Sequence, residues 1–346
     1  MKLYAGCYTD DTPEGGILIF DFCPRTGYLY LLSQFGFAPN PSYLALRGKM
    51  LYAVSETAGG ALTSFALEDG GAALRPVASV PSGGDDPCHI LIWPDGRHLS
   101  VANYSSGSLA VFDVLEGGAA ARRAAFCQHS GVGHDAQNRQ AGPHVHSTGM
   151  DASGQLLAAD LGLDRIFRYR LGAGGVLQSG ASALIAPPGS GPRHFCFSRD
   201  GKTLYAVAEM GNQLLEYAYD PEGECALRNV LPLLDAGFAG ENLAADIHLA
   251  PDGRFLYASN RGDDSIAAFR LGEDGRATLL ERTSAHGRGP RNFCLSPDGR
   301  FALIANQYSG NIAVCVRDTE SGHIGEMVCD VPAPRAVCLA LEDGGR

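Results

Sequence analysis

An apolar segment recurs seven times along the chain, and this repeat constrains the fold more than any other feature of the sequence. The copies are LYAGCY, LYAVSE, LSVANY, LLAADL, LYAVAE, LYASNR and ALIANQ. They end at positions 8, 56, 104, 161, 209, 261 and 307, so successive copies lie 48, 48, 57, 48, 52 and 46 residues apart. Periods of this length are typical of proteins built from stacked supersecondary units.

Each copy has the pattern of a small β-sheet. A turn such as WPDGR, SRDGK or SPDGR joins the first two strands, and a second turn such as YSSGS or YSGN leads into a third strand. Asp-Gly between β-rich segments indicates a hairpin, because both turn residues need a positive φ. A less regular fourth segment completes the unit. Four short strands per repeat are typical of a propeller blade.

The two ends of the chain complement each other. The C-terminal PRAVCLALEDGGR resembles PRNFCLSPDGR, which opens the preceding blade, and the N-terminal MKLYAGCY resembles the FALIANQ that follows that opening. One blade is therefore expected to combine strands from both ends, which removes an exposed sheet edge. The sequence predicts an all-β, seven-bladed propeller that forms a single domain over residues 1–346.

The composition limits the kinds of molecule that the protein is expected to bind and the compartment in which it is expected to occur. The chain has 45 glycines among 346 residues, which suits a turn-rich β-protein, and its net charge of −11 disfavours nucleic acid and anionic membranes. No apolar stretch is long enough for a membrane helix. The ten cysteines include no C-x-x-C pair, which favours reduced thiols and a cytoplasmic location. No leader is expected before Cys7, because only six residues precede it.

Aligning the copies reveals two columns of residues that change character from blade to blade. The residue after the proline-like start of the first strand is Ser42, Cys88, His146, Arg193, Ala245, Arg291 and Arg335. The residue that ends the second strand is Tyr8, Glu56, Tyr104, Leu161, Glu209, Arg261 and Gln307. We expect both columns to meet at one mouth of a central channel, where they form a cationic cluster with two carboxylates. These residues could instead line a wet channel or brace blades, but four arginines in an acidic protein favour a functional site.

The 57-residue spacing marks an insertion near residues 127–147. The segment CQHSGVGHDAQNRQAGPHVHS contains His129, His134, Asp135, Arg139, His144 and His146. So many histidines suggest zinc, yet the segment lacks a tight pair of ligands and no partner set is evident elsewhere. A loop over the mouth of a pocket is therefore favoured, with no metal and no cofactor.

Three stretches resemble successive blades of the bacterial lactonase family of seven-bladed propellers. They contain the motifs ANYSSGS, GPHVHS and GPRHF. This family includes propeller-type 6-phosphogluconolactonases and is related to carboxymuconate-lactonizing enzymes. The resemblance implies His146, Arg193, Glu209 and Arg261 as catalytic residues, with His144 as a rival for His146. We expect Arg291, Arg335, His144, Glu56 and Arg139 to contact the substrate.

The activity that the resemblance implies is hydrolysis of a small anionic sugar-acid lactone, 6-phosphogluconolactone above all, in carbohydrate metabolism. A lactonizing cycloisomerase that uses the same histidine and glutamate without water is the alternative within the enzyme class. A non-catalytic propeller that binds a protein at its rim is the alternative outside it. The sequence contains no G-x-S-x-G and no P-loop, so it gives no sign of a serine hydrolase or a nucleotide-binding enzyme.

Overall fold

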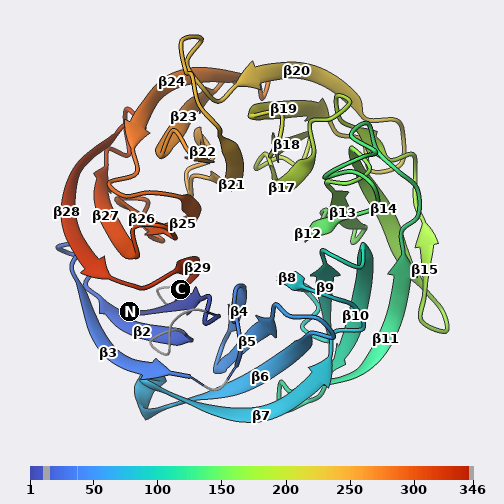
Figure 1. Cartoon of the computed structure of the whole chain (residues 1–346), viewed down its shortest axis with the longest axis horizontal. Helices are drawn as coiled ribbons and strands as arrows, with labels where there is room; N and C mark the ends of the chain where they lie inside the picture. Colours follow the sequence, from blue (N-terminus) through green and yellow to red (C-terminus); the bar gives the residue numbers. More distant parts are fainter. Residues whose placement is uncertain (11–15, 37, 343–346) are drawn as a thin grey trace. The chain divides into compact units, whose positions relative to one another are not determined.

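The computed structural model describes residues 1–10, 16–36 and 38–342, and these form seven antiparallel sheets. This is the all-β, seven-bladed propeller that the repeat predicts (Figure 1). The chain divides into two compact units. One comprises Met1–Ala53, Phe65–Arg75 and Leu233–Arg346, and the other comprises Val54–Ser64 and Pro76–Pro232. The expectation of one domain over residues 1–346 stays a prediction.

The first unit contains three whole blades. Two have strands in chain order: β21 (Leu243–Leu249), β22 (Phe255–Arg261), β23 (Ser265–Leu271) and β24 (Ala277–Ser284), then β25 (Pro290–Leu295), β26 (Phe301–Asn306), β27 (Asn311–Arg317) and β28 (Ile324–Pro332). The third has the order β29-β1-β2-β3, with bounds Ala336–Leu341, Lys2–Cys7, Ile17–Phe22 and Leu29–Phe35. Strands from both ends of the chain thus share one blade, as predicted (Figure 1).

The second unit also contains three whole blades. The first comprises β8 (Pro87–Ile92), β9 (His98–Asn103), β10 (Ser108–Val114) and β11 (Ala120–Gln128). The second comprises β12 (Val145–Met150), β13 (Leu156–Asp160), β14 (Arg165–Gly172) and β15 (Val176–Ser179), with β16 (Leu184–Ile185) beside β14. The third comprises β17 (Pro192–Phe197), β18 (Thr203–Ala208), β19 (Gln213–Ala218) and β20 (Ala226–Pro232). The remaining blade comprises β4 (Leu44–Arg47), β5 (Met50–Ser55), β6 (Ala61–Glu68) and β7 (Ala73–Pro81), and a 3-10 turn at Asp69–Gly71 lies between the last two. Its residues are divided between the two units.

The repeated apolar segments are the second strands of the blades. In β18, all six residues of TLYAVA are buried. One face of this strand packs on β13, where Leu204, Ala206 and Ala208 join Leu157 and Ala159 in one apolar cluster. Because such strands are covered on both faces, they appear as continuous apolar stretches and not as alternating patterns.

In several blades the residue after the proline-like position is the extra residue of a β-bulge. In β17, Pro192 pairs with Ala208 and His194 pairs with Val207, so Arg193 is the extra residue. His146, Cys88 and Arg291 are the extra residues of β12, β8 and β25 by the same criterion. A bulge bends its strand and redirects a side chain, and bulges are frequent beside active sites.

The alignment of Arg335 with Arg291 is wrong by two residues. The Tyr8 amide donates to the Arg335 carbonyl oxygen (3.2 Å), just as the Gln307 amide donates to that of Gly289 (2.9 Å). Arg335 therefore stands at the Gly289 position, and both have a left-handed φ, 53° and 70° respectively. A slip of two residues keeps every side chain on its original face of the sheet, so the apolar pattern does not reveal it.

Two further expectations are tested by the structure. All ten cysteines carry free thiols, as the absence of a disulfide pattern suggested. No helix in residues 1–10, 16–36 and 38–342 has the length and apolarity needed to span a bilayer.

Candidate active site

Arg193 and Glu209 meet at one end of the β17–β18 pair. Arg193 is the bulge residue of β17, and Glu209 directly follows β18, where its amide donates to the Gly191 carbonyl (2.7 Å). Arg193 Nε lies 2.8 Å from a carboxylate oxygen of Glu209, and both side chains are at most 5 % exposed. The two columns recognised in the sequence thus meet in this blade as an almost completely buried ion pair.

A second arginine reaches the same carboxylate from the insertion. Arg139 Nη2 donates to the other oxygen of Glu209 (2.7 Å) and to the Tyr104 hydroxyl (2.9 Å). Burying one carboxylate costs several kcal/mol unless partners compensate its charge, and here two guanidiniums do so. Both oxygens of Glu209 are therefore engaged by arginine, which favours Glu209 as an organiser of cationic groups over a proton carrier.

Arg139 remains open to a ligand. Its side chain is 41 % exposed, against 3 % for Arg193. Among the described residues, the hydrogen bonds of its side chain all use Nη2, which leaves Nη1 and Nε as donors for an incoming anion. Guanidinium forks of this kind suit phosphate and carboxylate groups. Burial raises the pKa of Tyr104 despite the nearby Arg139, so its hydroxyl stays protonated at neutral pH.

His146 lies next to this group. Its imidazole is buried and contacts the Tyr104 ring edge-on, with centroids 5.5 Å apart, and the His194 ring at 5.2 Å. Its Nδ1 lies 3.9 Å from the thiol sulfur of Cys88. The next residue, Ser147, donates to the carbonyl oxygen of Arg193 (2.7 Å), which links the His146 and Arg193 bulges.

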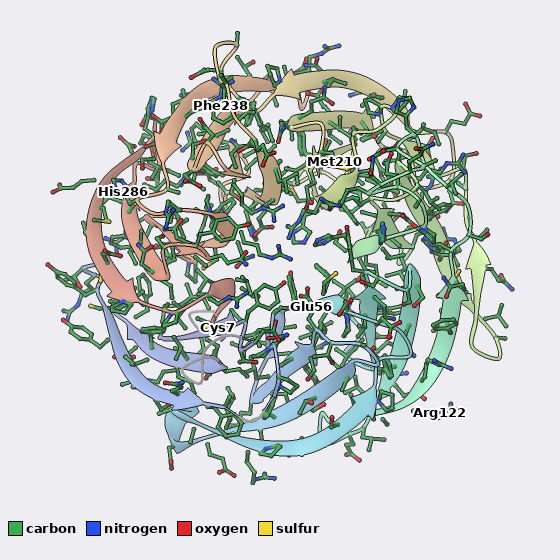
Figure 2. The ribbon with its side chains drawn as sticks, in the orientation of Figure 1. Cys7, Glu56, Arg122, Met210, Phe238 and His286 are labelled. Atoms are coloured by element: carbon green, nitrogen blue, oxygen red, sulfur yellow. The ribbon has the colours of Figure 1, made fainter. Side chains whose placement is uncertain are left out.

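His144, the rival histidine, has a different environment. Its ring is stacked on Tyr104, with centroids 4.4 Å apart, and its Nδ1 lies 3.0 Å from the Tyr104 carbonyl oxygen. Its amide donates to Asp160 (2.8 Å). These contacts make His144 a support for Tyr104, whereas the ring of His146 lies against the edges of Tyr104 and His194. The choice of His146 over His144 as the catalytic histidine stays a prediction. Glu56, which is labelled in Figure 2, directly follows β5, as Glu209 directly follows β18. Its contact with substrate stays a prediction.

The remaining predicted residues belong to the first unit. Arg261 ends β22, is buried, and donates from Nη2 to the Ala244 carbonyl oxygen (3.2 Å). The guanidiniums of Arg291 and Arg335 both lie over the Tyr8 ring, 5.6 and 5.5 Å from its centroid. Arg291 and Arg335 are therefore brought together on one aromatic ring despite the register error. The catalytic role expected of Arg261 and the substrate contacts expected of Arg291 and Arg335 stay predictions.

The histidines of the insertion are not grouped as metal ligands in the described structure. No group of three or more potential metal ligands occurs within the described parts of the chain. His129 instead contacts Asp160 through Nδ1 (2.6 Å) and the Tyr169 hydroxyl through Nε2 (2.8 Å). Burial alone would lower the pKa of His129, but the interactions with Asp160 and Cys127 together outweigh it and raise the pKa to about 9. His129 is thus a charged structural partner of Asp160 at neutral pH.

Comparisons with known proteins assign the chain to a family. The family described as "Lactonase, 7-bladed beta-propeller" matches residues 2–341. The chain belongs to this lactonase family. A 6-phosphogluconolactonase of Formosa agariphila is 34 % identical over 94 % of this chain and 95 % of its own length, and that of Bacillus subtilis is 31 % identical over 97 % of both. A solved structure, the periplasmic gluconolactonase PpgL of Pseudomonas aeruginosa, superposes with a TM-score of 0.91, 34 % identity and 98 % coverage of both chains.

Sequence reasoning underestimated two parts of this lactonase-family site. Tyr104 stood in the same column as Glu209 but received no role, although it contacts Arg139, His144 and His146. The position of Tyr104 in that column was the available signal. Gln140 was also overlooked, and its only signal was its place beside Arg139 in the insertion.

Gly162 lets the end of the insertion approach β13 closely. A Cβ at this position would lie 2.0 Å from the Gly142 carbonyl oxygen and 2.9 Å from the His144 amide. We expect Gly162→Ala to lower the free energy of unfolding by about 1–3 kcal/mol, because backbone must move, and to reduce lactonase activity through the displaced insertion. Chemical denaturation and an activity assay measure both effects. Gly142→Ala is the control, since a Cβ there meets no atom within 4 Å; equal effects of the two variants would contradict the prediction.

Proposed function

We propose that the chain hydrolyses the lactone of a phosphorylated sugar acid, with 6-phosphogluconolactone as its substrate. The observation that carries this proposal is the Arg193–Glu209–Arg139 array beside His146, in which Arg193 and Glu209 are buried and the Arg139 side chain is 41 % exposed. The named activity of relatives in Formosa agariphila and Bacillus subtilis supports the choice of a phosphorylated lactone.

The reaction requires a base for water and a donor for the developing oxyanion. His146 takes a proton from the water that attacks the lactone carbonyl carbon. Arg193, oriented by its Nε contact with Glu209, stabilises the negative oxygen of the tetrahedral intermediate. The bond between the carbonyl carbon and the ring oxygen then breaks, and His146 returns the proton to that oxygen. One water is consumed, and the products are a free hydroxyl and a carboxylic acid, which ionises.

In this scheme Arg139 binds the charged group of the substrate and does not act on the bonds that form and break. Its Nη1 and Nε, on a side chain that is partly exposed, are suited to a phosphoryl or carboxylate group, while Nη2 keeps the guanidinium attached to Glu209 and Tyr104. Glu209 thus holds one arginine for the oxyanion and one for the charged substituent. No cofactor takes part in these steps.

Replacing Glu209 with glutamine tests the organising role. We expect Glu209→Gln to fold, because Gln307 occupies the same register in the β25–β28 blade, where its amide makes the equivalent backbone bond. The neutral amide cannot orient two guanidiniums as a carboxylate does, so kcat/KM for 6-phosphogluconolactone should fall by about a hundredfold, as charge-assisted contacts are lost.

A matched control separates this role from the general effect of removing a buried charge. Glu216, on β19 of the same blade, is also fully buried. We expect Glu216→Gln to have the wild-type kcat/KM once the rate is corrected for the fraction of folded protein. Circular dichroism and thermal melting measure that fraction. A Glu209→Gln variant that is folded and as active as the wild type would contradict the proposed role.

A further inference from the structure

The insertion that carries Arg139 is anchored by one buried side chain. Gln140 is completely buried, and its amide nitrogen donates to the Leu161 carbonyl oxygen (2.8 Å) and to Asp164 Oδ1 (2.8 Å). Its amide oxygen accepts from the backbone of Asp135 (3.0 Å). The side-chain amide thus joins two parts of the insertion to each other, and it also ties the insertion to the turn between β13 and β14.

The backbone of Gln140 adds to this anchor. Its amide donates to the Asp135 carbonyl oxygen (3.1 Å), and its own carbonyl accepts from Gly133 (2.9 Å). These bonds fold residues 133–140 into a compact turn in which Arg139 precedes the anchor by one residue. A residue next to a fixed backbone position has little freedom, so Gln140 restricts where the Arg139 side chain begins.

The partner of Gln140 also holds the opposite side of the site. Asp164 accepts from the amides of Gly189 (2.7 Å) and Gly191 (2.8 Å), in the segment that leads into β17 and Arg193. The Gly191 carbonyl oxygen in turn accepts from the amide of Glu209. One carboxylate therefore connects the loop of Arg139 with the segment that places Arg193 and Glu209.

Another blade shows which part of this network is specific to the site. Asp264, in the equivalent turn of the β21–β24 blade, accepts from the Gly289 amide (2.7 Å), as Asp164 does from Gly191. The contact between aspartate and glycine is therefore part of the repeated scaffold. The contact from Gln140 is an addition that comes with the insertion, and a scaffold role alone does not require it.

We propose that Gln140 is a positioning residue, which holds Arg139 at Glu209 by tying the insertion to Asp164 and the Leu161 carbonyl. The effect on catalysis rests on the proposed function, whereas the effect on the loop does not. Removing the amide leaves a buried carboxylate oxygen and a buried carbonyl without this donor, which costs more than the loss of an exposed hydrogen bond.

A double-mutant cycle tests the catalytic part. Gln140→Met keeps the length of the side chain and removes its polar atoms, and Arg139→Ala removes the group that Gln140 is inferred to position. We expect each single variant to lower kcat/KM for 6-phosphogluconolactone about tenfold, mainly through KM, and the double variant to be no worse than Arg139→Ala. If the losses of kcat/KM in the two single variants multiply in the double variant, Gln140 acts independently of Arg139 and the proposal is wrong. An unchanged kcat/KM in folded Gln140→Met would also overturn it.

The matched control is Gln128→Met at the start of the same segment. The Gln128 amide nitrogen also donates to backbone carbonyls, those of Ser106, Gly107 and His129. No contact joins Gln128 to Asp164 in the described structure, so its replacement should leave kcat/KM within twofold. If Gln140→Met does not fold, Gln140→Asn enters the same cycle, because it keeps an amide that is too short to span both partners.

Hydrogen exchange tests the positioning part without any substrate. We expect the backbone amides of residues 133–140 to exchange at least tenfold faster in Gln140→Met than in the wild type, and to remain protected in Arg139→Ala and Gln128→Met. Unchanged exchange in Gln140→Met would refute the positioning role. Faster exchange without any lactonase activity in the wild type would refute the proposed function and leave the positioning role standing.

Discussion

Replacing His146 with glutamine is expected to lower kcat for lactone hydrolysis by about a hundredfold to ten-thousandfold, the range associated with loss of a general base. Glutamine keeps a hydrogen-bonding side chain of similar length but cannot accept the proton of the attacking water. The fold should persist, because His146 is the extra residue of a β-bulge and its backbone pairing does not depend on the ring. Steady-state kinetics, corrected for spontaneous hydrolysis, measure the loss.

His144→Gln is the control that separates the two histidines. His144 stacks on Tyr104 and supports it, so its replacement should lower kcat less than tenfold. A larger loss in His144→Gln than in His146→Gln would reverse the assignment. Equal, modest losses in both variants would instead mean that neither imidazole transfers the proton.

Removing the Arg193 guanidinium is expected to have the second largest effect. Loss of one oxyanion donor costs about 2.7–4 kcal/mol in the transition state, or about a hundredfold to a thousandfold in kcat. Arg193→Ala should nevertheless fold, because Arg139 still compensates the charge of buried Glu209. Arg193→Lys should recover only part of the rate, since a lysine ammonium lacks the planar fork that binds Glu209 and the oxyanion together.

Arg122→Ala is the matched control for Arg193. Arg122 lies on the outer strand β11, away from the inner strand β8 of its sheet (Figure 2), and its side chain is 83 % exposed. Its surface ion pair with Asp113 contributes little to stability. We expect wild-type kcat and KM from this variant. If folded Arg193→Ala is as active as Arg122→Ala, Arg193 does not stabilise the oxyanion.

Most of the fold could be predicted from the sequence, because each blade repeats the same apolar strand and hairpin turn. The repeat also placed Arg193 and His146 in one column, and the structure shows that both are extra residues of β-bulges. The error at Arg335 has a physical origin. A two-residue slip preserves the alternation of faces, and only backbone pairing distinguishes Pro334-Arg335 from a true counterpart of Pro290-Arg291.

The insertion marks where prediction from sequence ends. Its length was visible as one longer spacing, and Arg139 could be named as a substrate contact. The bond from Arg139 to Glu209 joins residues 70 positions apart, and no periodicity relates them. Gln140 is a similar case, since its buried partners Leu161 and Asp164 lie beyond the whole of β12 and β13. A segment that does not repeat has no second copy in the sequence with which it can be aligned, so its contacts could not be predicted in this way.

The most direct test of the proposed hydrolase activity is the rate at which purified protein opens 6-phosphogluconolactone, compared with the unphosphorylated gluconolactone. After subtraction of spontaneous hydrolysis, we expect a saturable rate proportional to protein concentration. We also expect a kcat/KM at least tenfold higher for the phosphorylated lactone, a preference that Arg139→Ala should reduce, because the Nη1 and Nε donors of Arg139 suit a phosphoryl group. Hydrolysis of both lactones at no more than the spontaneous rate would contradict the proposal that this protein is a lactone hydrolase.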